Sequence, residues 1–257
     1  MFYSKNPVFS EKSIVKAEVL QENVLYPMRM FEHLYADYTD GIVTGVRLQA
    51  KDTDELLLSP GIIKYQGRLY HMEESACVEF EHNNRMNYLK IRFDNGERTS
   101  DGELFHTQVL LTNEETCFPY EMELGRFFTE AGARLIDHAQ HFEDFFIEHN
   151  HIDVRYVPYS ARTEATISPE ITVAFARDML QKQEKGEADI CFCMQCLRKE
   201  PVDREIICAY ISVKTGRPVA KMNNAQMCEA LLSILKKGRT MVAERQTFRE
   251  RRSIIVD

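Results

Sequence analysis

The chain has 257 residues, of which 44% are hydrophobic and 28% are charged, a composition typical of an ordinary folded protein. Its 32 Lys and Arg against 40 Asp and Glu give a net charge of -8, so neutralising nucleic-acid phosphates is not expected to be its main task. The composition also excludes a collagen, a coiled coil, a disulfide scaffold and a membrane channel.

The N-terminal region does not resemble an export signal, because residues 1–12 contain Lys5, Pro7, Glu11 and Lys12 and no apolar stretch. No run approaches the roughly 18 to 20 apolar residues that a membrane helix needs. Seven cysteines without a signal peptide indicate reduced thiols, and therefore a cytoplasmic protein.

Residues 1–39 are predicted to form an amphipathic helical arm. Apolar residues recur there at spacings of three and four, which places them on one face: Ile14, Ala17, Leu20, Val24, Met28, Phe31, Tyr35 and Tyr38. Ser10 or Ser13 is expected to cap the helix start, and Pro27 to kink or break the helix. The stripe needs a partner surface, either this chain's own sheet or another subunit.

Residues 40–165 are predicted to form an antiparallel β module. From Asp40 the apolar period changes to two, and Gly45 indicates a bulge or a close approach of two backbones. Ser59-Pro60-Gly61 predicts a turn, and Gln66-Gly67 predicts a tight hairpin. The expected strands cover residues 42–50, 56–58, 62–65, 68–72, 88–93, 104–111 and 121–128, with a mobile polar loop at 94–102. Short strands without intervening helices favour a sandwich or a barrel-like sheet.

Residues 166–257 are predicted to be rich in α-helix, which makes the whole chain an α+β protein. Ser168-Pro169-Glu170 is a helix-start signal, and it precedes a buried stripe. The stripe consists of Ile171, Phe175 and Met179. Residues 201–213 are expected to be helical, and Asn223 or Asn224 is expected to cap a last helix. Lys236, Lys237 and Gly238 predict where that helix ends.

Motifs of known enzyme classes are missing from the sequence. A nucleotide-hydrolysing protein needs a glycine-rich loop followed by Lys and Ser or Thr, and no such string occurs. There is also no GxGxxG, GxSxG or HExxH. We therefore expect no enzyme, no catalytic residues and no cofactor.

A cluster of cysteines is the sharpest candidate for a metal site. Cys191, Cys193, Cys196 and Cys208 supply four thiols, the number that a structural zinc requires. Large apolar side chains surround them, however, and only Cys193 and Cys196 have the CxxC spacing. We therefore favour buried structural thiols, because free cysteine behaves as a small hydrophobic residue. Zinc analysis of the purified protein would decide between the two.

Other polar clusters carry weaker signals. The segment 137–151 is rich in histidines and carboxylates, in a pattern equally typical of a solvated surface. The candidates there are His138, His141, Glu143, Asp144, Glu148, His149 and His151. Carboxylate pairs that are expected by chance in so acidic a chain are Glu73-Glu74, Glu114-Glu115, and Glu121 with Glu123. The terminal arginines Arg245, Arg249, Arg251 and Arg252 are typical of a solvated tail.

One stretch, about residues 35–75, carries a family resemblance. It contains Tyr38-Thr39-Asp40-Gly41-Ile42-Val43-Thr44-Gly45, then Leu58-Ser59-Pro60-Gly61-Ile62, then Tyr65-Gln66-Gly67-Arg68-Leu69-Tyr70. The order of strand, turn and hairpin resembles the opening module of bacteriophage tail-fibre and baseplate-attached proteins. The resemblance implies a structural part of a tail, or of a tail-derived contractile injection particle, with the β module docking onto the baseplate. The rest of the chain departs from a true fibre because it lacks long repetitive β stretches.

The resemblance implies a structural adaptor whose partners are other tail or baseplate subunits, and a second copy of the chain is a further possibility. We expect no membrane partner and no nucleic acid. Two alternatives stay open. One is a nucleic-acid-associated or zinc-binding accessory protein. The other is an enzyme whose site is assembled from scattered residues such as His71, Asp101, Glu103 and His106.

Overall fold

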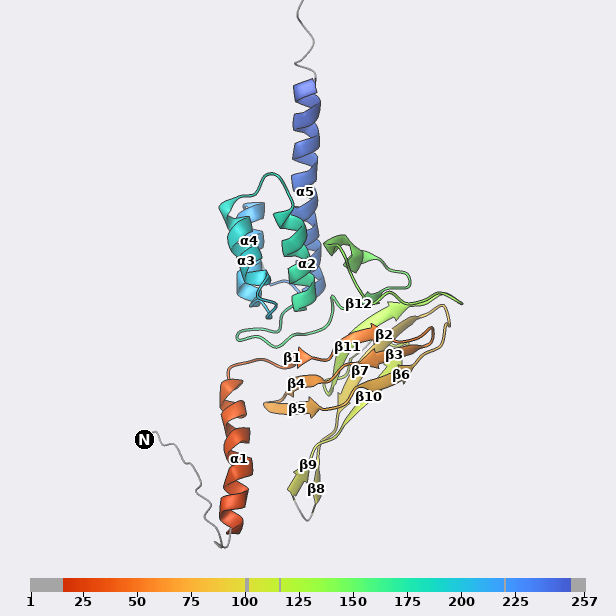
Figure 1. Ribbon diagram of the computed structural model, residues 1–257, viewed down its shortest axis with the longest axis vertical. Helices are drawn as coiled ribbons and strands as arrows, with labels where there is room; N and C mark the ends of the chain where they lie inside the picture. The colour runs from red at the N-terminus through yellow and green to blue at the C-terminus, as the bar shows by residue number, and fades with distance from the viewer. Residues whose placement is uncertain (1–15, 100–101, 116, 220, 251–257) are drawn as a thin grey trace, which may run out of the picture.

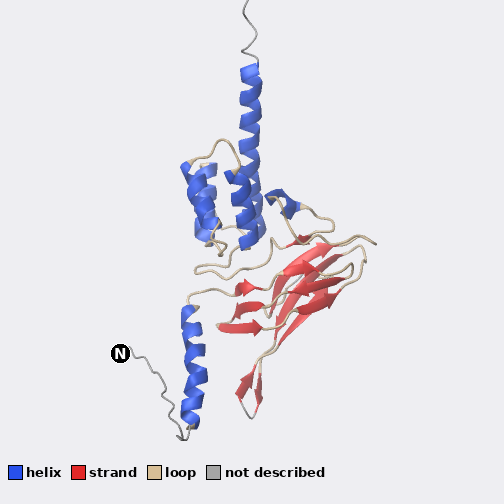
Figure 2. Cartoon of the chain, viewed as in Figure 1, coloured by secondary structure: helices blue, strands red, loops and turns tan. Residues whose placement is uncertain are grey.

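The computed structural model describes residues 16–99, 102–115, 117–219 and 221–250. A helix lies at one end, β-sheets occupy the middle, and a helical region lies at the other end (Figures 1 and 2). The helices are α1 (Ala17–Leu34), η1 (Phe142–Phe146), α2 (Pro169–Leu180), α3 (Glu187–Cys196), α4 (Arg204–Thr215) and α5 (Asn224–Glu250). The strands are β1 (Gly41–Gly45), β2 (Leu48–Ala50), β3 (Glu55–Leu58), β4 (Gly61–Tyr65), β5 (Arg68–Met72), β6 (Ala76–Glu79), β7 (Met86–Phe93), β8 (Glu97–Thr99), β9 (Gly102–Leu104), β10 (Thr107–Thr112), β11 (Glu121–Phe128) and β12 (Ile152–Asp153).

The α+β fold class is confirmed. Every pairing between named strands is antiparallel, and the described strands form separate sheets instead of a closed barrel: β1-β4-β5, β2-β3-β6, β10-β7-β11-β12 and the hairpin β8-β9. The boundaries drawn after residues 39 and 165 stay predictions.

The N-terminal helix is confirmed, with different limits. The sequence predicted a kink or a break at Pro27; α1 runs through Pro27 without a break, so the break is wrong and the kink stays a prediction. Proline removes one backbone donor there, but the remaining hydrogen bonds keep the helix continuous. The helix also ends at Leu34, before Tyr38. The predicted caps Ser10 and Ser13 lie outside the described residues.

The predicted hairpin and close approach in the β module are both confirmed. Gln66 and Gly67 join β4 to β5 with φ angles of 47° and 78°, the left-handed pair that a tight two-residue turn uses. Gly45 has φ 67°, and a Cβ added there would lie 2.0 Å from the carbonyl oxygen of Pro60. Only glycine allows β1 and the start of β4 to approach this closely.

The β module has one apolar core between its sheets. β7 is the central strand of its sheet, and Leu89, Ile91 and Phe93 alternate toward the core, as the period-two pattern predicts. Met122 and Leu124 of β11 contribute to the same cluster from the neighbouring strand. Ile42 of β1 and Ile63 of β4 belong to the same cluster, which attaches the β1-β4-β5 sheet next to α1 in the chain.

Five features differ from the sequence-based expectation. The polar loop predicted at 94–102 contains β8, which pairs with β9 to form a projecting hairpin (Figure 1). β6, β12 and α3 had no strong period in the sequence. α5 continues past Gly238 to Glu250, so the predicted helix end is wrong, because a single glycine costs only about 1 kcal/mol in a helix.

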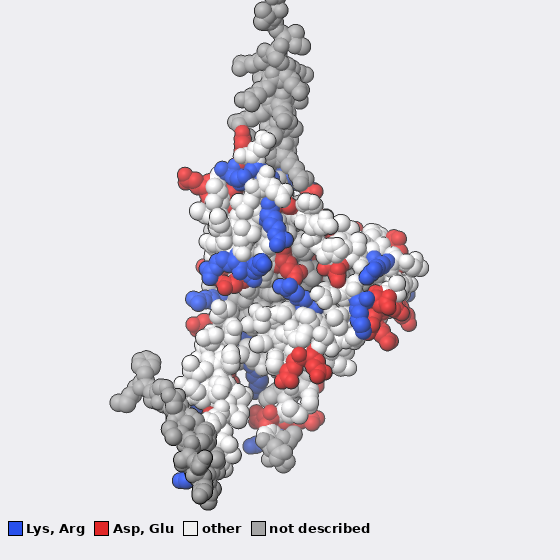
Figure 3. All heavy atoms as spheres, viewed as in Figure 1, with Lys and Arg blue, Asp and Glu red and all other residues white. Residues whose placement is uncertain are grey.

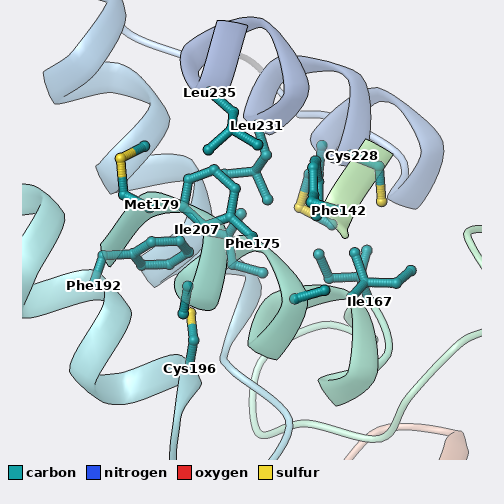
Figure 4. Packing of buried hydrophobic residues seen from close by; sticks show 14 of the residues in the cluster. Phe142, Ile167, Phe175, Met179, Phe192, Cys196, Ile207, Cys228, Leu231 and Leu235 are labelled. Carbon is teal, nitrogen blue, oxygen red and sulfur yellow. The ribbon is translucent and has the colours of Figure 1, made fainter. Parts of the chain in front are cut away.

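The C-terminal helices surround a second core. Ile171, Phe175 and Met179 of α2 are buried, as predicted, and the Oγ of Ser168 accepts a hydrogen bond from the N–H of Glu170. Phe175 lies among aromatic and aliphatic side chains from η1, α3, α4 and α5 (Figure 4). The predicted helix at 201–213 is confirmed as α4, and Asn223 accepts from the N–H of Gln226 at the start of α5. None of the described helices combines the length and the hydrophobicity needed to cross a bilayer.

Candidate docking surface

The clearest surface feature is the apolar face of α1. None of the 18 residues of this helix is buried. Six large apolar side chains are exposed on it: Leu20, Val24, Met28, Met30, Phe31 and Leu34. Val24 is 62% exposed and Phe31 is 56% exposed. Single exposed apolar residues are ordinary, whereas a contiguous row of them indicates an interaction surface. We call this set the α1 stripe.

The opposite side of α1 carries charges, so the helix has two distinct faces. Glu18, Glu22 and Arg29 follow one another at spacings of four and seven residues, which places them together and away from the stripe. A helix that covered its own protein would turn its apolar face inward. The apolar face of α1 is instead open, because every side chain of the α1 stripe is more than half exposed.

The C-terminal end of α1 is attached to the β module through a buried lysine. Lys64 of β4 is 5% exposed, and its Nζ donates to the carbonyl oxygens of Tyr35 (2.5 Å), Ala36 (3.1 Å) and Tyr38 (2.5 Å). Carbonyls at a helix C-terminus have no partner within the helix, and a cation is favourable there. The lysine therefore holds the end of α1 in place while the rest of the helix projects (Figure 1).

A second attachment lies just after the helix. The N–H of Thr39 donates to the carbonyl oxygen of Ala161 at 2.8 Å, and the hydroxyl of Ser160 donates to the carbonyl oxygen of Thr39 at 2.5 Å. A groove of about 450 Å³ opens beside this junction, and Tyr35 and Tyr38 line it together with residues of the α3–α4 connection. The α1 stripe therefore leads into a concave surface at the base of the helix.

The four candidate zinc ligands do not form a common site. Cys193 and Cys196 are buried in the helical core, Cys208 is partly buried, and Cys191 is exposed. Burial raises the pKa of Cys193 to about 11 and that of Cys196 to about 12, so both are protonated thiols at neutral pH. Among the described residues, no group of three or more His, Cys, Asp or Glu is placed to hold a metal ion.

The histidines at 138–151 have separate partners. The Nδ1 of His138 contacts Asp137 at 3.2 Å, that of His141 contacts Asp178 at 3.1 Å, and that of His149 contacts Glu130 at 3.1 Å. Each of these three rings is therefore paired with a different carboxylate. His151 differs from the others because it is buried.

The carboxylates at 115–123 are neutralised by arginines. The guanidinium of Arg126 contacts Glu123 at 2.7 Å and Glu115 at 2.8 Å, and it stacks 3.5 Å above the ring of Tyr156. Burial disfavours its charge, but the two carboxylates more than compensate and raise the pKa of Arg126. Glu121 pairs with Arg92 at 2.7 Å. Paired in this way, the acids serve the structure of the sheet.

The scattered candidates for an assembled active site lie on different elements. His71 lies on β5 and is exposed, His106 is exposed beside β10, and Glu103 is exposed on β9. Asp101 lies outside the described residues, as do Arg251 and Arg252, whereas Arg245 and Arg249 fall within α5. On the face shown in Figure 3, positive and negative residues are interspersed.

Comparisons with known proteins give remote likenesses in fold. No protein-family model matches the chain, and no curated protein matches it. The chain is similar to the crystal structure of TssK, with 10% identity over 91% of this chain and 69% of that chain and a TM-score of 0.39. It is also similar to a chain of the TssK-TssF-TssG baseplate subcomplex of the type VI secretion system, with 8% identity over 92% of this chain and 99% of that chain and a TM-score of 0.44. Baseplate components are thus found among its structural neighbours, at a similarity too low to assign a function.

Proposed function

We propose that the chain is a structural adaptor of a phage tail or a tail-like contractile particle. It docks onto a neighbouring baseplate-type subunit through the α1 stripe. The observation that carries this proposal is the exposure of that stripe on a helix with no buried residue and with a fixed C-terminal end. The resemblance of residues 35–75 to baseplate-attached proteins supports it.

The chemistry of the stripe fits a protein partner. Phe31 and the neighbouring Tyr35 and Tyr38 supply aromatic contact area, which is enriched at the centres of protein interfaces. Burying an exposed Leu or Phe side chain contributes about 1.5–3 kcal/mol, so several such residues together suffice for a stable contact. On this proposal the chain is made in the cytoplasm and becomes part of an assembled particle.

The test compares two double variants of α1. Val24→Asp with Phe31→Asp places two charges in the stripe, whereas Arg29→Asp with His33→Asp places the same residues on the opposite face. Circular dichroism first checks that both variants are folded. Particles are then purified from producing cells, and the amount of the chain in them is measured by mass spectrometry.

We expect the stripe variant to be depleted from particles about tenfold or more, because charged residues at an interface centre are strongly unfavourable. The control variant is expected to be incorporated like the wild type. Incorporation of the stripe variant at the wild-type level would contradict the proposed docking surface. Absence of the wild-type chain from particles would contradict the proposed function as a whole.

A further inference from the structure

Strand β10 forms one edge of the sheet β10-β7-β11-β12. It pairs with β7 residue for residue from Thr107 to Thr112, and this pairing contains no bulge. Among the described helices and strands, only β7 lies along β10. The other side of β10 is therefore the place at which a further strand could join the sheet.

The hydrogen bonds of β7 show which backbone groups of β10 face outward. The N–H of Phe93 donates to the carbonyl oxygen of Tyr120 at 2.9 Å, on the β11 side. The N–H of the next residue, Asp94, donates to the carbonyl oxygen of His106 at 3.1 Å, on the β10 side. Because this direction alternates along a strand, even-numbered residues of β7 face β10. The even-numbered residues of β10 lie opposite them, so its odd-numbered residues direct their N–H and C=O groups outward.

The outward groups belong to Thr107, Val109 and Leu111, and no described residue forms a hydrogen bond with them. Unpaired edges of this kind accept another strand, and proteins normally protect them with charged residues, proline or bulges. The edge strands β5 and β6 of the other sheets carry Arg68 and Glu79. The sequence of β10 is Thr-Gln-Val-Leu-Leu-Thr, which contains no charged residue and no proline.

The side chains of β10 suit pairing with a second copy of the same strand. In an antiparallel pair centred on Leu110, Val109 lies opposite Leu111 of the second copy, on the face that packs against the core. Gln108 lies opposite Thr112 of the second copy on the other face, where Leu110 lies opposite its own copy. Apolar side chains thus meet apolar ones, polar side chains meet polar ones, and no like charges are opposed.

The core of the β module is incompletely closed beside this edge. A small apolar cavity of about 120 Å³ lies there, and its lining includes Thr107 and Val109 of β10 and Tyr70 and Met72 of β5. A two-fold axis perpendicular to the sheet keeps the core faces of both copies on the same side. The second copy would therefore bring its own apolar side chains next to this cavity.

We propose that β10 is the interface between two copies of the chain, which pair antiparallel about a two-fold axis at Leu110. In this pair Val109 and Leu111 exchange main-chain hydrogen bonds across the axis, and the two sheets become one. The inference goes beyond the adaptor function and does not rest on it, because β10 is separate from the α1 stripe.

Sedimentation equilibrium of the full chain tests whether the pair forms. The average mass is expected to rise toward that of two chains between about 5 and 200 µM, as for an interface of modest size. Gln108→Lys with Thr112→Lys opposes like charges and is expected to weaken the association at least about tenfold. Gln108→Lys with Thr112→Glu is the matched control. It places opposite charges across the axis and is expected to associate like the wild type.

A disulfide cross-link tests where the axis lies. Leu110 and its copy form a non-hydrogen-bonded pair, whose Cα atoms lie about 4.5 Å apart, within the range of a disulfide. Leu110→Cys is therefore expected to give a covalent dimer after oxidation with diamide. Gln108→Cys is expected to give none, because its two copies lie roughly 14 Å apart. The wild type, which has exposed cysteines of its own, gives the background.

Three results would each overturn the proposal. They are a wild-type chain that stays monomeric up to about 200 µM, association that the paired lysines leave unchanged, and cross-linking of Leu110→Cys no faster than that of Gln108→Cys. Thermal unfolding checks that each variant is folded. None of these measurements involves particles, so failure here and failure of the adaptor function are distinguishable.

Discussion

Helices α1 and α2 have the same kind of sequence pattern and opposite surroundings. Both place apolar residues at spacings of three and four, yet eight of the 12 residues of α2 are buried and none of the 18 residues of α1 is. α2 contacts α3, α5 and η1, whereas α1 is held at one end by Lys64. The pattern therefore defines which face of a helix is apolar, and the topology of the chain decides whether anything within the same molecule covers it.

The largest effect on stability is expected at Phe175, in the buried helix α2. The side chain is fully buried and lies edge-on to Phe142, Phe192 and Tyr210. Phe175→Ala removes these contacts and leaves a cavity, which costs about 3–5 kcal/mol. Urea unfolding measures the change, and a loss below about 1 kcal/mol would mean that the helical core is not packed as described.

A second substitution tests a buried polar group in the same helical region. Asp189 of α3 accepts hydrogen bonds from Tyr210 at 2.7 Å, Lys214 at 2.9 Å and the N–H of Gly186 at 2.9 Å. Burial alone would raise the pKa of Asp189, but these donors outweigh it and hold the pKa below the ordinary value of 3.8. The charged carboxylate therefore stabilises the fold above pH 3.8, and this contribution is lost as the pH falls through the lower value in the folded state.

Asp189→Asn is expected to lower the free energy of unfolding by about 1–3 kcal/mol at pH 7, because hydrogen bonds to a charged group are lost. The difference from the wild type should narrow in acid, where the wild-type carboxyl is protonated. Urea unfolding between pH 7 and pH 2 measures it. A difference independent of pH would show that the charge of Asp189 is not what stabilises the helices.

The next prediction tests how the C-terminal end of α1 is attached to the β module. Lys64→Met removes the donor to three carbonyls at the end of α1 and is expected to cost about 1–3 kcal/mol, because buried acceptors lose their partner. Hydrogen exchange should become faster in residues 30–39 and stay unchanged in α4. Lys51→Met, at an exposed lysine paired with Glu55, is the control. It should change neither the free energy of unfolding nor the hydrogen exchange of residues 30–39.

The smallest effect on stability is expected in the α1 stripe itself. Phe31→Ala changes a side chain that is more than half exposed, so the free energy of unfolding should change by less than about 0.5 kcal/mol. The same urea experiment with Phe175→Ala allows the two phenylalanines to be compared, since each lies in the apolar stripe of a helix. A loss as large as that of Phe175→Ala would show that α1 is covered by its own chain.

Much of the fold follows from local signals in the sequence. The stripes of α1 and α2, the start signal at Ser168 and the turn at Gln66 and Gly67 depend on neighbouring residues, and all four are confirmed. The special role of Gly45 could also be predicted, because few other reasons explain a glycine within a strand.

Other elements had no local signal. α3 buries Phe192, Cys193 and Cys196 on one side and exposes Ile190 and Met194 on the other, so its apolar residues show no period. β8 lies in a polar stretch that resembles a loop, because strands outside the core need no alternation of apolar residues. The end of α5 was misplaced because Lys and Gly signals are only weakly unfavourable to a continuing helix.

The candidate sites also differ in how far the sequence predicts them. The α1 stripe could be read from residue spacing, although its exposure could not. One cleft, between the β module and α2, is lined by Arg47, His151 and Lys199, which lie far apart in the sequence. Nothing in a single sequence indicates that such distant residues line one cleft. The histidine spacing was compatible with a metal site or with a solvated surface, and among the described residues no metal-holding group is assembled.

The length of α5 determines how far apart two partners of the molecule would be held. Its 27 residues extend about 40 Å, and it leaves the helical region in the direction opposite to α1 (Figure 1). Whatever contacts the far tip of α5 is held clear of whatever contacts α1, with two packed cores between them. The protein thus sets a minimum distance between a partner bound at α1 and a partner bound at the end of α5.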